Sequence, residues 1–363
     1  MKIKFVHNKS IYSFAFPIIF FAALAAFSLS CGFSRDGGIF KTFNRGETWE
    51  HKIKAANNQT ISTANVLRIE IDPGDSKIIY LGTKGNSLIK TMDGGELWYS
   101  ASAGNLDKRA DIFDIAIDPK NSANVFLAGY QNGLGMFLRS NDAGKNWEQT
   151  YQTARELYAV LTVEIDPFES SAVYMGTAEG GFFSSSDYGK NWKAIKWFDD
   201  AVSDLKINPI DPRIMYLSTF NSGVFKSNDK GQTWQKLEES DGFWESKDIE
   251  TLVMDKNNPD TLYTGSRRGF LKSYNGGQTW QKLNIIIPPE SLTVQAIALD
   301  LLNPSFIYYA AGNVVYRSQD YGQTWAYNSI QTGGLINVLT IDHKDSNILY
   351  AGISREPTFG LGY

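Results

Sequence analysis

Hydrophobic and polar positions along most of the chain repeat with a period of about 46 residues. Each period contains an apolar run that ends at an acid or amide, then a short polar turn, then a second apolar run around an aromatic residue. Eight residues separate the acid or amide from the aromatic in every copy: Asp72 and Tyr80, Asp118 and Phe126, Asp166 and Tyr174, Asn208 and Tyr216, Asp255 and Tyr263, Asp300 and Tyr308, Asp342 and Tyr350. Short apolar runs bounded by turn residues are typical of β-strands, so each period predicts a first pair of strands.

A second hairpin is predicted in each period at an eight-residue segment, Ser-x-Asp-x-Gly-x-Thr-Trp, that we call the box. The third residue can accept hydrogen bonds from turn amides, and the glycine supplies the positive φ that a tight turn requires. We expect the closing Trp to begin the next strand and to pack against the neighbouring sheet. The box acids and amides are Asn44, Asp93, Asp142, Asp187, Asp229, Asn275 and Asp320, and the closing residues are Trp49, Trp98, Trp147, Trp192, Trp234, Trp280 and Trp325. Four strands per period are the content of one β-propeller blade.

The boxes resemble the Asp-box, a hairpin turn found in sialidases, Vps10-type sortilins, xyloglucan-cleaving glycoside hydrolases and photosystem assembly factors. The resemblance covers residues 37 to about 354 and implies an all-β propeller. The repeated Asp-Pro phrase is most similar to that of sortilins and xyloglucan hydrolases. The phrase typical of photosystem assembly factors is matched only around Gly82 to Gly95.

Counting the repeats predicts one closed seven-bladed propeller over residues 37–363. The chain starts its repeats with a box hairpin, Gly38 to Lys52, that lacks a first strand pair, and ends them with a strand pair, Ile336 to Gly352, that lacks a box. Pairing these two segments would complete the seventh blade and cover its open sheet edges. The tail Thr358 to Tyr363 resembles the start of another third strand, Gly133 to Phe137, and is an alternative occupant of the place given to Gly38 to Phe43.

The first thirty residues differ from the repeats. Three lysines precede an uncharged apolar run from Ile11 to Leu29, which is the pattern of an export signal. Cys31, the only cysteine, follows at the position where a signal peptidase for lipoproteins requires one, and the segment resembles a bacterial lipoprotein signal. We predict a signal peptide over 1–30, lipidation of Cys31, a tether over 31–36 and a place on the periplasmic or surface side of a bacterial envelope. Ordinary cleavage or an uncleaved anchor are the alternatives.

Charge and composition restrict the partners. Removal of the signal takes away three of 35 basic residues and none of 39 acidic ones, leaving a net charge of about −7. The longest basic clusters are pairs, such as Lys108-Arg109, so nucleic acid is an unsuitable partner. A single cysteine allows no internal disulfide. His7, His51 and His343 are too scattered for a metal cluster or catalytic triad, so we expect no metal and no cofactor, and His343 is expected to be a solvated turn residue.

The repeated acids are predicted to be structural. A residue that recurs in every blade holds a turn, whereas one active site needs a feature that breaks the symmetry. A sialidase would require three converging arginines, one in a Phe/Tyr-Arg-Ile-Pro segment that does not occur here. Xyloglucan hydrolases carry their acids between two propellers, and we expect one propeller.

Candidate binding residues are those that interrupt the repeat. Boxes and Asp-Pro turns are expected on one face, so the loops that vary in length lie on the opposite one, which we call the variable face. Exposed aromatic residues and arginines dominate binding hot spots. The candidates on this face are Arg109, Tyr130, Arg155, Trp197, Phe198, Phe243, Trp244, Arg267 and Arg268. The alternative is that Trp197 and Trp244 pack inward as loop anchors.

The sequence therefore predicts a monomeric, non-catalytic binding or assembly module, anchored to the membrane by lipid, that presents its variable face to a protein or glycan of the cell envelope. A glycoside hydrolase or lyase with acids in the variable loops is the alternative, with Asp199, Asp200, Glu239 and Asp241 as candidates. A face that only shapes oligomers is a third possibility.

Overall fold

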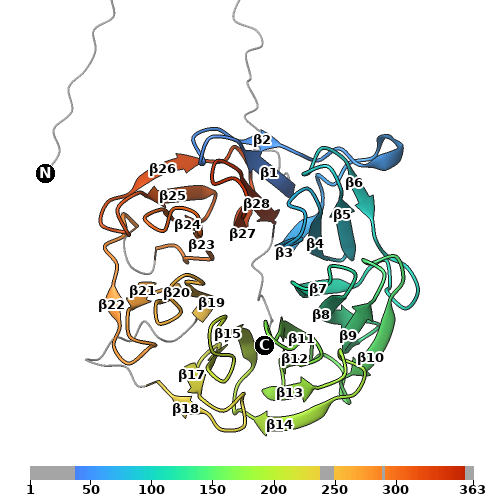
Figure 1. Ribbon diagram of the computed structural model, residues 1–363. Helices are drawn as coiled ribbons and strands as arrows, with labels where there is room; N and C mark the ends of the chain where they lie inside the picture. The colour runs from blue at the N-terminus through green and yellow to red at the C-terminus, as the bar shows by residue number, and fades with distance from the viewer. Residues whose placement is uncertain (1–36, 238–248, 288–290, 356–363) are drawn as a thin grey trace, which may run out of the picture. The chain divides into compact units, whose positions relative to one another are not determined.

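The computed structural model describes residues 37–237, 249–287 and 291–355, and these form seven four-stranded antiparallel sheets arranged as blades around a ring (Figure 1). The chain divides into two units, Met1–Phe33 and Ser34–Tyr363, and the ring belongs to the second. The predicted all-β, seven-bladed propeller is confirmed. The signal, Cys31, the tether and the tail 356–363 lie outside the described residues. No helix in the ranges given above is long and apolar enough to cross a membrane.

The blades are numbered from the one that joins the two ends of the ring. Blade 1 contains, from the innermost strand outwards, β27 (Leu335–Ile341), β28 (Leu349–Ser354), β1 (Gly38–Thr42) and β2 (Glu50–His51). Blade 2 contains β3 (Asn65–Ile71), β4 (Ile79–Lys84), β5 (Leu88–Thr91) and β6 (Trp98–Ser100), and a 3-10 turn, η1 (Ala56–Asn58), precedes it. Blade 3 contains β7 (Asp111–Ile117), β8 (Val125–Gln131), β9 (Leu134–Ser140) and β10 (Glu148–Gln152).

The remaining blades follow the same order. Blade 4 contains β11 (Val160–Ile165), β12 (Val173–Thr177), β13 (Gly181–Ser185) and β14 (Lys193–Trp197). Blade 5 contains β15 (Val202–Ile207), β16 (Met215–Thr219), β17 (Gly223–Ser227) and β18 (Gln235–Lys236). Blade 6 contains β19 (Ile249–Met254), β20 (Leu262–Ser266), β21 (Gly269–Ser273) and β22 (Gln281–Lys282). Blade 7 contains β23 (Ala296–Leu299), β24 (Ile307–Ala311), β25 (Val314–Ser318) and β26 (Ala326–Ser329).

Ring closure occurs where the sequence predicts it. Strand β1 pairs antiparallel with β28 in an unbroken register from Gly38 opposite Ile353 to Thr42 opposite Leu349. The first hairpin of the chain thereby becomes the outer half of the blade whose inner half is the last strand pair. The edges that each half would otherwise expose are both covered.

The box turns and the Asp-Pro turns lie on one face, as expected. In blade 2 the amide of Gly94 in the box donates a hydrogen bond to the carbonyl of Lys77 in the Asp-Pro turn (2.9 Å). Equivalent bonds join the two turns in the other six blades. The loops that face the opposite way connect the second strand to the third, and the fourth strand to the next blade.

Each box acid closes its turn by accepting several hydrogen bonds. The Oδ1 atom of Asp187 accepts from the amides of Lys190 (3.0 Å) and Asn191 (2.9 Å) and from the hydroxyl of Ser185 (2.8 Å). Bonds from the backbone and the side chain of Asn191 lower the pKa of Asp187 to about 2. In this geometry the Asp187 carboxylate holds the box turn closed.

The turn contains one feature that the sequence analysis missed. In blade 3 the box glycine, Gly144, has a φ of 82°, and the preceding Ala143 is also left-handed, with a φ of 60°. The residue at this position has a positive φ in all seven boxes, namely Arg45, Gly94, Ala143, Tyr188, Lys230, Gly276 and Tyr321. Only two of them are glycines, so the residue types at this position did not indicate a left-handed conformation.

Neighbouring blades are joined through that same residue. Lys90 on β5 and Tyr80 on β4 both donate to the carbonyl of Ala143 in the next blade, at 2.9 Å each. Lys41, Arg139 and Arg317 bond the equivalent carbonyl of the blade that follows theirs. A basic residue on the third strand thus holds the left-handed position of the neighbouring turn.

Candidate functional site

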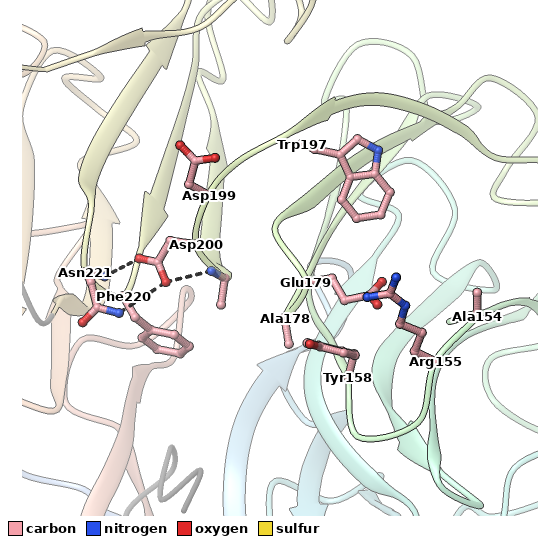
Figure 2. A pocket seen from close by; sticks show the side chains of 11 residues that line it. Ala154, Arg155, Tyr158, Ala178, Glu179, Trp197, Asp199, Asp200, Phe220 and Asn221 are labelled. Atoms are coloured by element: carbon pink, nitrogen blue, oxygen red, sulfur yellow. Dashed lines mark hydrogen bonds between the residues drawn. The ribbon is translucent and has the colours of Figure 1, made fainter. Parts of the chain in front are cut away.

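A cavity of about 650 Å³ opens on the variable face between blades 4 and 5 (Figure 2). Four loops supply its lining: β10–β11, β12–β13, β14–β15 and β16–β17. The lining residues are Ala154, Arg155, Tyr158, Ala178, Glu179, Trp197, Asp199, Asp200, Ala201, Phe220 and Asn221. The volume is within the range of small-molecule binding sites in proteins.

Trp197 forms one wall of this cavity. It is the last residue of β14 and pairs with Gly181 on β13, whose lack of a side chain lets the indole lie close to the sheet. The ring packs edge-on against Phe183, with centroids 5.7 Å apart, yet 54% of the residue is exposed. The indole is therefore held by its strand while its surface stays accessible, so it does not pack inward as a loop anchor.

Phe198, which was predicted to contact a ligand, lies in the core. Successive residues of an extended chain point to opposite sides, so the exposure of Trp197 directs its neighbour inward. The Phe198 ring packs against Phe225 (5.0 Å) and Trp234 (5.9 Å), and its amide donates to the carbonyl of Gly180 (2.8 Å). Phe198 supports the loop and is not available to a ligand, which corrects the prediction.

Asp200 is committed to holding the β16–β17 loop. Its carboxylate accepts from the amides of Asn221 and Ser222 (3.1 Å), from the side-chain amide of Asn221 (3.3 Å), and from the amide of Ala201 (2.9 Å). Figure 2 shows the bonds from Asn221 to Asp200, which link the two loops across one side of the cavity. A carboxylate with this many fixed donors positions a loop.

The other polar groups of the cavity are less constrained. Arg155 and Asp199 are exposed, and Tyr158 and Glu179 are half-buried. In the view of Figure 2, Arg155, Tyr158 and Glu179 lie on the same side as Trp197, with Asp199 and Asp200 across from them. A flat apolar surface beside a guanidinium, a phenol and carboxylates can hold a ligand that has both an apolar face and several hydroxyl groups.

The β10–β11 loop carries local strain at its tip. Leu157 has a φ of 71° and is 79% exposed, and its amide donates to the carbonyl of Gly133 (3.2 Å). The buried Thr153 hydroxyl donates to the carbonyls of Arg155 (3.0 Å) and Tyr158 (3.3 Å). A large side chain in the left-handed region is uncommon and often marks a functional loop.

The remaining sequence-predicted candidates lie elsewhere. Arg109 is exposed on the β6–β7 loop and Tyr130 is half-buried at the end of β8, while Arg267 and Arg268 form the β20–β21 turn. All four are on the variable face, and none lines the cavity. Phe243, Trp244, Glu239 and Asp241 lie outside the described residues.

Sequence reasoning did not select Tyr158 or Glu179. Glu179 lies in the turn between the second and third strands, and the corresponding turns of blades 2, 3, 5, 6 and 7 carry no acid. This break in the repeat was a usable signal. His343 also differs from expectation, since it is half-buried against the centre of the ring and its Nε2 atom is covered. Within the described ranges no group of three or more His, Cys, Asp or Glu side chains could hold a metal ion.

A seven-bladed propeller with a cavity among its variable loops is a scaffold that serves both binding proteins and hydrolases. The family model for "Sortilin, neurotensin receptor 3" matches residues 135–240, a range that contains every residue lining the cavity. The curated "Xyloglucanase Xgh74A" of Acetivibrio thermocellus is 29% identical over 134 residues, which are 31% of this chain and 16% of that protein. The match therefore spans well under two thirds of the relative.

Solved structures share the fold. The xyloglucanase of glycoside hydrolase family GH74 from Xanthomonas campestris has a TM-score of 0.69 at 16% identity, over 80% of this chain and 51% of that one. The structure titled "YCF48 bound to D1 peptide" has a TM-score of 0.62 at 18% identity, over 83% of this chain and 97% of that one. At these identities the comparison establishes a common propeller and nothing about activity.

Proposed function

We propose that this chain is a non-catalytic binding module of the cell envelope, tethered by lipid at Cys31, whose cavity beside Trp197 holds a short segment of glycan. The exposed indole of Trp197 carries the proposal. An aromatic face held rigidly at the edge of a cavity matches the apolar face of a sugar ring. Arg155, Tyr158, Glu179 and Asp199 can bond its hydroxyl groups.

The names of the matched proteins favour a glycan over a peptide as the ligand. The curated match is named a xyloglucanase, and the matched solved structure from Xanthomonas carries the same name. The structure of YCF48 with D1 peptide shows that a propeller of this fold can also bind a polypeptide. A peptide ligand is therefore an outcome that the experiment has to distinguish.

Binding is favoured over hydrolysis by the state of the acids. Glycoside hydrolysis requires two carboxyl groups, one of which keeps its proton in a sheltered environment. Asp200 is held by four hydrogen bonds, and Asp199 is exposed. The acid pair that the hydrolase alternative needs is thus not assembled from these two residues.

The test is a calorimetric titration of the full chain with a panel of soluble plant and bacterial glycans and unrelated peptides, with product detection on every glycan. We expect saturable binding of a glycan and no released sugar. Trp197→Ala should weaken binding roughly 30-fold or more, since buried aromatic anchors contribute about 2 kcal/mol or more. The matched control is Tyr327→Ala, an aromatic on the outer strand of blade 7 that is 69% exposed.

Sugar release that Asp199→Asn abolishes would establish the hydrolase alternative. Binding of peptides alone would overturn the glycan assignment. Equal binding by the Trp197→Ala and wild-type chains would remove this cavity as the site.

A further inference from the structure

The cavity on the variable face, between blades 4 and 5, carries more negative than positive charge. Its lining contains three carboxylates, Glu179, Asp199 and Asp200, and one cation, Arg155. Among the described residues no ion pair joins Arg155 to any of these carboxylates. The lining therefore has two negative charges more than positive ones, three against one. A ligand that fills this cavity has to match that excess.

Asp200 keeps its charge although its oxygen atoms are held. Its donors are the backbone amides of Ala201, Asn221 and Ser222 and the side-chain amide of Asn221, and all of them are neutral. Neutral donors stabilise the ionised form of a carboxylate without cancelling its charge. Asp200 is therefore a fixed negative charge on the side of the cavity across from Trp197 (Figure 2).

The other two carboxylates have free acceptor atoms. Within the described ranges neither Glu179 nor Asp199 accepts a side-chain hydrogen bond or forms an ion pair. Glu179 is half-buried, and Asp199 is exposed. A carboxylate that is partly removed from water interacts more strongly with a nearby cation than a fully solvated one does. Glu179 is thus the stronger of the two partners for a positively charged group.

Glu179 lies beside a row of aromatic rings that ends at Trp197. Tyr151 on β10 packs against Phe183 (5.1 Å between centroids), which packs against Trp197 (5.7 Å). Burial raises the pKa of Tyr151 to about 12, and the charge of Glu179 adds to the rise, which places that carboxylate near the row. In the view of Figure 2, Glu179 lies between Trp197 and Tyr158. An indole face and a carboxylate both attract organic cations.

We propose that the glycan held in this cavity is cationic, namely an oligomer of an amino sugar whose amino groups are free, with one ring stacked on Trp197 and its ammonium paired with Glu179. An equatorial amino group projects from the edge of a sugar ring, so it can reach a carboxylate while the face of the ring lies on the indole. Asp199 and Asp200 attract the ammonium groups of the neighbouring rings, and a uronic acid is repelled. This inference rests on the proposed function, because it names the class of glycan for the same cavity.

The test is calorimetric titration of the full chain with three β-1,4-linked tetramers that differ in one substituent: those of glucosamine, N-acetylglucosamine and glucose. The titrations are made at pH 6, where the free amino groups are protonated. We expect the glucosamine tetramer to bind about tenfold more tightly than either neutral tetramer. Added salt should weaken only the binding of the glucosamine tetramer, because salt screens charge.

Carboxylate variants locate the preference. Glu179→Gln should weaken binding of the glucosamine tetramer about fivefold, and Asp199→Asn about twofold, in the range of partly and fully exposed ion pairs. Neither change should alter the affinity for the glucose tetramer. The matched control is Glu148→Gln, which removes an exposed carboxylate on the outer strand β10 and should change no affinity.

Equal affinity for the three tetramers, lost in Trp197→Ala, would overturn this inference and leave the proposed function standing. An affinity for the glucosamine tetramer that Glu179→Gln or Trp197→Ala leaves unchanged would overturn it too, because the amine would then bind elsewhere. Binding of none of the tetramers also overturns it, and the wider glycan panel then decides the proposed function separately. If Glu179→Gln fails to fold, Asp199→Asn and the salt dependence of the wild-type chain still decide.

Discussion

The two faces of the propeller are built from the same blades, but the residues of the box face recur from blade to blade, whereas those of the variable face differ between blades. On the box face, the turns accept equivalent hydrogen bonds, and four of them are also bonded by the blade before them, as Ala143 is by Lys90 and Tyr80. On the variable face, Trp197 and Glu179 occur in one blade each. Repeated residues stabilise the ring, and a ligand site is to be sought where the repeat is interrupted.

The largest effect should come from removing a box tryptophan. Trp98 is fully buried and donates from Nε1 to the carbonyl of Lys52 (2.9 Å) in the preceding blade. Trp98→Ala should lower the free energy of unfolding by about 3–5 kcal/mol, the usual loss for a large buried aromatic. Urea denaturation followed by circular dichroism measures this, and a loss comparable to that of an exposed residue would show that the boxes do not carry the fold.

A box acid should matter less, because its turn keeps other hydrogen bonds. Asp142→Ala removes an acceptor for the amides of Lys145 and Asn146. We expect a loss of about 1–2 kcal/mol in unfolding free energy, similar to that of a helix cap. Asp199→Ala on the variable face is the matched control and should stay within about 0.5 kcal/mol, as for other exposed sites.

Glu164 lies on β11, the innermost strand of blade 4. It should give the free energy of unfolding a pH dependence opposite to that given by the box acids. Because the pKa of Glu164 is raised to about 7, the folded chain binds more protons than the unfolded chain between about pH 4.5 and 7. The stability that the protonated Glu164 contributes is therefore lost as the pH rises through that window. Urea midpoints at pH 5 and pH 8 should fall more in the wild type than in Glu164→Gln, and parallel curves would contradict this.

The smallest effect on stability is expected at the residue proposed to matter most for binding. Trp197→Ala should change the unfolding free energy by no more than about 0.5–1 kcal/mol, since over half of the residue is already in water. A loss as large as that of Trp98→Ala would mean that Trp197 is an anchor of the ring.

Most of the fold was predictable because the same sequence pattern recurs in each blade. The period, the box, the shared face of the two turns and the closure of Gly38 to Thr42 on β28 all follow from local patterns. The second left-handed position of the box was not predictable, because residues as different as Ala143 and Tyr188 occupy it and its support comes from another blade.

The sites were less predictable, since they depend on which loops meet. The sequence pointed to Trp197 and Arg155, but the opposite directions of Trp197 and Phe198 depend on where β14 ends. The sequence made Asp200 a candidate catalytic acid, but the β16–β17 loop places Asn221 within hydrogen-bond distance of its carboxylate. Arg68 pairs with Asp114 across two adjacent blades, and the sequence of one repeat does not show which residues of its neighbour lie beside it.

The measurement that most directly tests the division between the faces is a paired one on Trp197→Ala: glycan affinity by calorimetry and urea midpoint on the same preparation. The account predicts that affinity falls by well over tenfold while the midpoint stays where it is in the wild-type chain. A midpoint that drops together with affinity, or an affinity that does not change, would contradict it.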